Sequence, residues 1–126
     1  MPFEQLSDNA HAIVTEIRNI IEKNQSKGDE KPGTGWEYSN PELSVEISRL
    51  EEELNKDDFK VLETHVLHLF NNGRIHNITS HAVLIPLNGS SSFGPDEPLR
   101  ESHYTRQTRT IYGENIDIIT VALKEK

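Results

Sequence analysis

The stretch that decides the fold covers residues 59–87. It reads Phe-Lys-Val-Leu-Glu-Thr-His-Val-Leu-His-Leu-Phe at residues 59–70, Asn-Asn-Gly at 71–73, and Arg-Ile-His-Asn-Ile-Thr-Ser-His-Ala-Val-Leu-Ile-Pro-Leu at 74–87. Nowhere else in the chain are apolar and β-branched residues so dense for so long, which is typical of strands. Glycine supplies the positive φ that a tight reversal needs, so the two runs and the Asn-Asn-Gly between them predict a central β-hairpin.

The length of the hairpin loop sets which residues face one another. A three-residue loop with Gly73 in the left-handed conformation places Leu69 opposite Ile75. The same register places His68 opposite His76, whereas a two-residue loop shifts the register by one and separates the histidines. The histidine pair therefore depends on the turn.

Two segments before the hairpin carry helical patterns. In residues 7–24, Ser7 and Asp8 can cap a helix, and apolar residues recur at three- and four-residue spacing. In residues 40–56, Asn40-Pro41-Glu42 is a good helix start, although the apolar residues that follow also alternate at first, as in a strand. We favour a helix in both segments. The first is expected to cover a face of the sheet, with an oligomer contact as the alternative.

The rest of the chain is expected to form two flexible loops and a second hairpin. The loops are residues 24–35, which are polar, and residues 88–103, which are rich in serine, glycine and proline. Residues 104–112 and 115–123 have strand-like patterns on either side of Gly113-Glu114, which predicts a short reversal between two paired strands.

These segments together predict one α+β domain over residues 1–126. The helical part occupies about residues 1–56, and the antiparallel sheet of two hairpins occupies about residues 59–124. Such a sheet leaves open edges and one poorly covered face, so we expect a homo-oligomer.

Charge and composition exclude several classes of function. The chain has 21 acidic and 13 basic residues and a net charge of −8, which argues against binding duplex nucleic acid. It has no cysteine, which excludes disulfides, thiolate nucleophiles and cysteine-based metal sites. The first residues do not resemble a signal peptide, and no apolar run approaches the ~20 residues that span a bilayer. We therefore expect a soluble, cytoplasmic protein with no membrane partner.

The strongest candidate site lies in and after the second loop. Three arginines, a histidine and a tyrosine fall within ten residues of this acidic chain: Arg100, His103, Tyr104, Arg106 and Arg109. Guanidinium groups bind phosphate in a bidentate manner, and Phe93 and Tyr104 could complete a pocket for a nucleotide-like ligand. The alternative is that the arginines pair with the protein's own carboxylates or with a neighbouring subunit. On a regular strand Arg106 and Arg109 point to opposite faces, so sharing one ligand requires a bulge or a site between subunits.

Aromatic residues and histidines give weaker signals. Trp36 and Tyr38 follow Gly33-Thr34-Gly35, where they either form a lid that stacks on a planar ligand or anchor the loop to the core. Four of the six histidines lie in residues 65–81, but no three share a face in either register. No His-Glu-x-x-His pattern occurs, so we expect neither a metal site nor a cofactor.

These observations lead to three hypotheses. The first is a non-catalytic protein that binds, and could sequester, a small phosphate-bearing ligand through Arg100, His103, Tyr104, Arg106, Arg109, Phe93 and Trp36. The second is an acidic interaction or inhibitor protein whose residues 51–58 dock on a basic protein partner. The third is a histidine-based, metal-dependent hydrolase, which is the weakest because nucleophile, base and ligand set are all missing.

Overall fold

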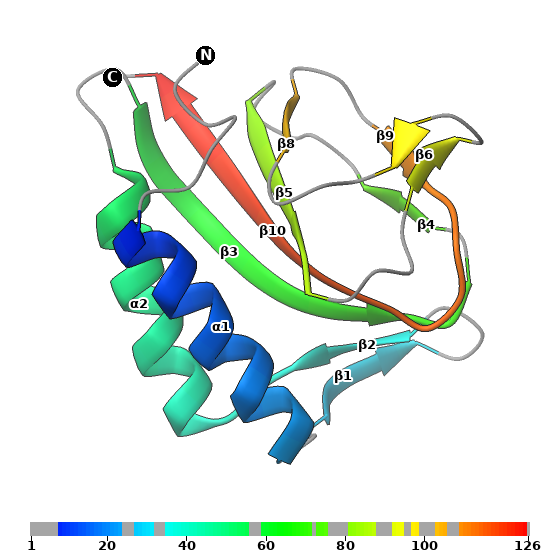
Figure 1. Cartoon of the computed structure of the whole chain (residues 1–126), viewed down its shortest axis with the longest axis horizontal. Coiled ribbons are helices and arrows are strands. Elements are labelled where there is room, and N and C mark those ends of the chain that lie inside the picture. The colour runs from blue at the N-terminus through cyan, green and yellow to red at the C-terminus, as the bar shows by residue number, and fades with distance from the viewer. Residues whose placement is uncertain are drawn as a thin grey trace.

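The structure of this protein, a computed structural model, describes residues 8–23, 27–31, 35–55, 59–71, 73–75, 81–87, 92–94, 97–98, 103–105 and 109–125. Within these residues two α-helices pack against an antiparallel sheet, which confirms the predicted α+β class (Figure 1). No helix in the described part of the chain is long and apolar enough to cross a membrane.

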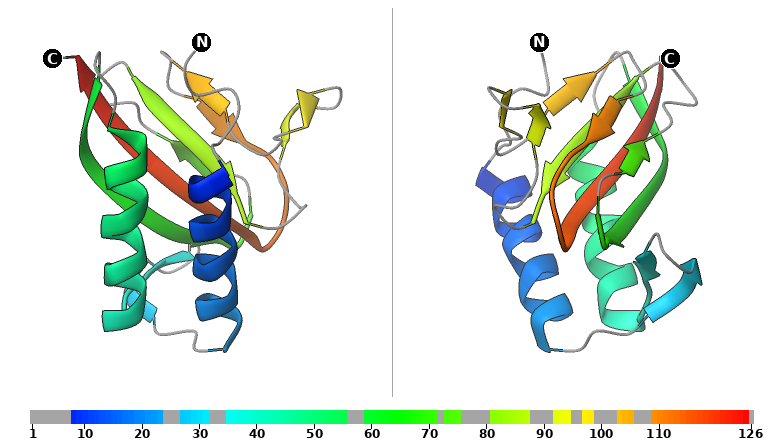
Figure 2. Two further views of the ribbon diagram at one scale, coloured as in Figure 1. Left: turned by 60° about the vertical axis from the view of Figure 1, so that its left-hand side comes forward. Right: turned by 90° about the vertical axis from the view of Figure 1, so that its right-hand side faces the viewer.

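The elements follow one another in the order α1 (Asp8–Lys23), β1 (Lys27–Lys31), β2 (Gly35–Tyr38), α2 (Pro41–Leu54), β3 (Phe59–Leu69), β4 (Gly73–Ile75), β5 (Ala82–Pro86), β6 (Ser92–Gly94), β7 (Glu97–Pro98), β8 (His103–Thr105), β9 (Arg109–Ile111) and β10 (Ile116–Glu125). The main sheet has six strands in the order β1-β2-β3-β10-β5-β8. Two further pairs, β4 with β9 and β6 with β7, form small sheets of their own. Figure 2 shows both helices on one face of the main sheet, and Figure 1 shows β6 and β9 away from them.

Both predicted helices are present. α1 buries one stripe of its surface, namely Ala10, Ile13, Val14, Ile17 and Ile21. α2 begins where the sequence indicated, because the Asn40 side-chain oxygen accepts a hydrogen bond from the Leu43 N–H at 2.8 Å. The strand alternative for this segment is excluded: Leu43 and Leu50 are buried, as helical spacing requires, whereas Val45 is 59% exposed.

The prediction of a central hairpin is wrong, although the first of its two strands is present as β3. β3 pairs with β2 and with β10 over the whole length of β10, whereas β4 pairs with β9, and β5 pairs with β10 and β8. Leu69 therefore lies opposite Ile116 and Gly35 instead of Ile75, and His68 lies opposite Asp117 and Trp36 instead of His76.

β3 and β10 suit one another because both strands are long and both contribute apolar residues to each face of the sheet. On the helix-covered face, Val66 and Ile119 join the core under α1 and α2. On the other face, Leu69, Ile116 and Ile118 form a second apolar cluster. A strand as long as β10 can pair along β3 and extend the apolar clusters on both faces, whereas the three residues of β4 cannot.

The prediction of a second hairpin between residues 104–112 and 115–123 is also wrong. The chain does reverse between β9 and β10, where Gly113 has φ 146° and Asn115 has φ 49°. The two strands then separate, since β9 pairs with β4 and Tyr112 bridges to Ser92. Parts of the expected flexible loops are strands as well: residues 27–31 form β1, and residues 92–94 and 97–98 form β6 and β7.

Candidate ligand site at His68

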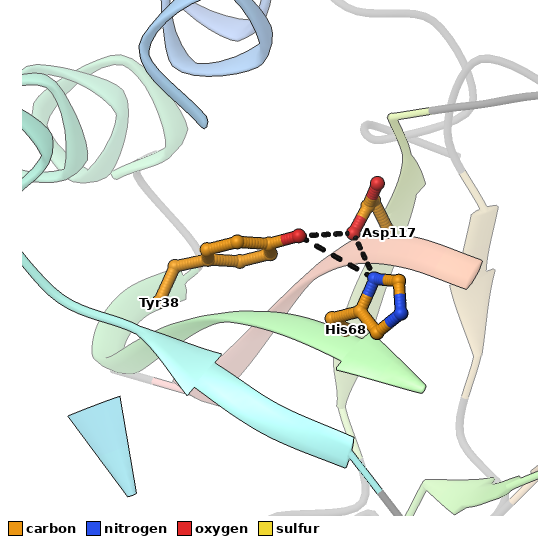
Figure 3. A network of polar contacts seen from close by, with 3 residues as sticks. All are labelled: Tyr38, His68 and Asp117. Carbon is orange, nitrogen blue, oxygen red and sulfur yellow. Dashed lines mark hydrogen bonds and ion pairs between the residues drawn. The ribbon is translucent and has the colours of Figure 1, made fainter. Parts of the chain in front are cut away.

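Three strands bring Tyr38, His68 and Asp117 together on the helix-covered face of the sheet (Figure 3). Tyr38 comes from β2, His68 from β3 and Asp117 from β10, and 79 residues separate Tyr38 from Asp117. We call these three residues the His68 network. Because β3 lies between β2 and β10, the network ties three neighbouring strands together.

The hydrogen bonds of the network fix the state of the histidine. The Tyr38 hydroxyl donates to Oδ1 of Asp117 at 2.7 Å, and Nδ1 of His68 lies 2.8 Å from the same oxygen. An ionised carboxylate only accepts hydrogen bonds, so Nδ1 carries a proton. The 3.4 Å contact between the Tyr38 hydroxyl and Nδ1 is then a secondary one, because both groups direct their hydrogens at Asp117. In the neutral ring Nε2 is left with a lone pair.

Tyr38 acts as a donor and not as a base. Burial, followed by the hydrogen bond to Asp117 and the charge of that carboxylate, raises the pKa of the Tyr38 hydroxyl well above its usual range. The residue is only 4% exposed. The phenol therefore keeps its proton and donates a hydrogen bond that holds the carboxylate in place.

Aromatic rings surround the imidazole of His68. Trp36 stacks on it with ring centroids 4.1 Å apart and an angle of 11° between the planes. The Phe70 ring meets the imidazole edge-on at 5.7 Å. The His68 side chain is 12% exposed, and Figure 3 shows Nε2 on the side of the ring away from Asp117. Within the described part of the chain, no group forms a hydrogen bond with Nε2.

A glycine lets β2 approach β3 closely at this level. A Cβ atom on Gly35 would stand 1.8 Å from the carbonyl oxygen of His68, and the φ of Gly35 is +149°. Any other residue here would push β2 away from β3. Gly35 therefore places Trp36, the next residue, directly over the His68 ring.

The network also lies beside the end of β5 and close to α1. The Leu87 N–H donates to the backbone oxygen of Asp117 at 2.8 Å, and the Leu87 oxygen accepts from Nε of Arg18 at 2.7 Å. This chain of bonds joins α1 to the strand that carries the network carboxylate. Helix and network are thus held in a fixed relation.

The opposite face of the same strands carries a second histidine. Nδ1 of His65 lies 2.9 Å from Glu37, and Nε2 lies 3.4 Å from Glu63. Burial lowers the pKa of His65, but the hydrogen bonds and charges of Glu37 and then Glu63 outweigh it and raise the pKa above its ordinary value. His65 and His68 point away from each other, and the described residues contain no group of three or more side chains that could hold a metal ion.

Most residues of the sequence-predicted site lie outside what the structure describes. Arg100 and Arg106 fall outside the described residues. Only the backbone of His103 and Tyr104 in β8, Arg109 in β9 and Phe93 in β6 is described. The strands concerned belong to three different sheets, with β8 at one edge of the main sheet. Trp36 is the one predicted site residue whose side chain is described, and it stacks on His68.

Reasoning from the sequence missed the His68 network. Its members are separated along the chain, and no motif spacing connects them. One signal was present: Asp117 is a carboxylate inside the otherwise apolar run Ile-Asp-Ile-Ile-Thr-Val-Ala-Leu. Comparison with models of protein families, with curated proteins and with solved structures gave no match.

Proposed function

We propose that the protein binds a small ligand at the His68 network, and that the ligand donates a hydrogen bond to Nε2 of His68. One observation carries this proposal. Nδ1 of His68 is held by Asp117 at 2.8 Å, while Nε2 faces away from that carboxylate on a ring that remains 12% exposed. Such a ring is a hydrogen-bond acceptor whose direction is fixed before any ligand arrives.

The surroundings favour a planar, uncharged ligand. Trp36 and Phe70 offer ring surfaces beside His68, which suit an aromatic compound. The carboxylate of Asp117 and the net charge of −8 disfavour an anion at this position. A ligand with an O–H or N–H group would pair with the acceptor at Nε2.

Phenol and anisole form a matched pair of probes. Phenol can donate a hydrogen bond to Nε2, whereas anisole has a similar ring and no donor. In a histidine-selective ¹H–¹⁵N spectrum, phenol should shift the Nε2 resonance of His68 in a saturable way, and anisole should not. The resonance of His68 is identified by its loss in His68→Gln, and the His65→Gln variant, altered on the opposite face, should respond like the parent. Equal shifts with both compounds, or none with either, would refute a donor-specific site at Nε2.

A second candidate is a phosphate-bearing ligand held by the arginine-rich segment of residues 100–109, without catalysis. The observation that favours it is the gathering of Arg100, Arg106 and Arg109 in a chain that is otherwise acidic. A local group of bidentate donors is what an anion needs in order to bind a protein of net negative charge. His103, Tyr104 and Phe93 would contribute further contacts.

We also propose that the protein associates with further copies of itself in the cytoplasm. β1 and β8 form the two edges of the six-stranded sheet, and strand edges favour pairing with a second copy. Light scattering on the purified protein tests this point, since a monomer over a range of concentrations would remove it.

A further inference from the structure

His68 and Asp117 are arranged so that the histidine can take up a proton. When Nε2 gains a proton the ring becomes an imidazolium, and the Asp117 carboxylate lies 2.8 Å from its other nitrogen. Both side chains are mostly buried, with 12% and 22% of their surface exposed. Charges interact more strongly there than in water, so the carboxylate stabilises the cation at the moment it forms.

Tyr38 keeps the carboxylate in the position that this step requires. Its hydroxyl donates to the same oxygen of Asp117 that His68 uses, at 2.7 Å. Two donors on one oxygen hold that oxygen beside the imidazole. These two hydrogen bonds restrict rotation of the Asp117 carboxylate. Tyr38 and Asp117 are thus positioning residues, and His68 is the group that meets the ligand.

We propose that His68 is a general base that removes a proton from a carbon or oxygen acid bound beside Trp36. The inference rests on the proposed ligand site at Nε2. The X–H bond of the bound compound breaks, its electron pair stays on X, and the proton forms a new bond to Nε2. The imidazolium then returns the proton to another position of the compound or to water, so that the protein ends unchanged. No further reactant is required.

The substrate class follows from the same contacts. Trp36 and Phe70 favour a flat ring, and Asp117 disfavours a substrate that is anionic before the reaction. The negative charge develops on the substrate only as the proton leaves, when the imidazolium beside it compensates for it. Neutral cyclic compounds with a weakly acidic C–H or O–H group therefore fit the site.

The base-promoted ring opening of 5-nitrobenzisoxazole tests this inference directly, because its acidic C–H can point at Nε2 as the O–H of phenol does, whereas anisole has no acidic hydrogen. A base removes the C–H proton, the C–H electron pair completes a nitrile, and the N–O bond breaks to release a coloured phenolate. The full chain should catalyse the reaction with saturation, and the rate should rise with pH and then level off once the imidazole is neutral. His68→Gln should lower the saturable rate by about a hundredfold, in the range of general-base catalysis. The control His65→Gln should leave it unchanged.

The roles of Tyr38 and Asp117 are tested by a separate measurement. Asp117→Asn and Tyr38→Phe should lower the maximal rate. In the histidine-selective spectrum Asp117→Asn should also weaken the preference of neutral His68 for a proton on Nδ1, which a merely structural change would not do. If His68→Gln fails to fold, the pH profile of the parent protein still decides the matter. A rate that is proportional to hydroxide, without a plateau, contradicts a histidine base.

The two experiments distinguish a wrong general base from a wrong ligand site. Donor-specific binding of phenol together with no saturable ring opening refutes the general base and leaves the ligand site intact. Absence of both refutes the ligand site as well. Equal rates for His68→Gln and His65→Gln overturn the assignment of the base to His68.

Discussion

Gly35 lies so close to His68 that a Cβ atom on the glycine would stand 1.8 Å from the histidine's carbonyl oxygen. This approach sets Trp36 over the imidazole and allows Tyr38 to reach Asp117. The positions of Trp36 and Tyr38 in the candidate site thus depend on a residue without a side chain.

Gly35→Ala should destabilise the protein strongly. The substitution adds a clash with backbone to the strain of a φ of +149°, and each effect costs about 1–3 kcal/mol. Urea unfolding measures the loss. Gly113→Ala serves as the control, because Gly113 has a similar φ of 146° in a turn and reports the cost of that backbone conformation. Equal losses in the two variants would contradict the close approach of β2 to β3.

Tyr38→Phe should lower the free energy of unfolding by about 1–2 kcal/mol, because it removes a hydrogen bond to a carboxylate and keeps the ring. Tyr112→Phe is the matched control, since Tyr112 is 45% exposed and should tolerate the change. Thermal and urea unfolding of both variants check this. If they behave alike, the Tyr38 hydroxyl does not contribute to the stability of the network.

The stability of the protein should depend on pH through His65. Glu37 and Glu63 raise the pKa of His65 in the folded state, so the protonated form is favoured by folding. This contribution is fully present below the pKa of the unfolded chain, ~6.5, and is lost as pH rises through the higher folded-state value. The side chain is 38% exposed, so solvent screening keeps the effect small.

Urea unfolding between acidic and mildly alkaline pH, in parent and His65→Gln, isolates this contribution. The difference between the two proteins should shrink as pH rises. A difference that grows with pH would show that the acidic neighbours do not hold the protonated ring.

A phosphate-bearing nucleotide should raise the melting temperature if residues 100–109 bind an anion, by mass action on the folded state. Arg106→Lys and Arg109→Lys should each lose most of the shift, because lysine cannot replace a bidentate guanidinium. Arg49→Lys is the control, since Arg49 lies on α2 and pairs with Glu46. A broad nucleotide panel that leaves the melting curve unmoved removes this candidate.

The helices could be predicted from the sequence because their signals are local. The Asn40 cap and the apolar stripe of α1 lie within the segments they define. The pairing of the strands could not be predicted, because the Asn-Asn-Gly turn indicates that the chain reverses but not which strands pair. The partner of β3 is a distant strand that extends the apolar clusters on both of its faces, and His68 meets Asp117 across 49 residues. The site was missed for the same reason, since it exists only after β2, β3 and β10 have paired.

The most direct test of the account is the position of the proton on His68. A histidine-selective ¹H–¹⁵N spectrum of the unliganded protein distinguishes the two neutral forms of each ring. With Asp117 accepting from Nδ1, the structure predicts that neutral His68 carries its proton on Nδ1 and that Asp117→Asn weakens this preference. A neutral His68 protonated on Nε2 would contradict the account, because the ring would then offer a ligand no lone pair and the site no base.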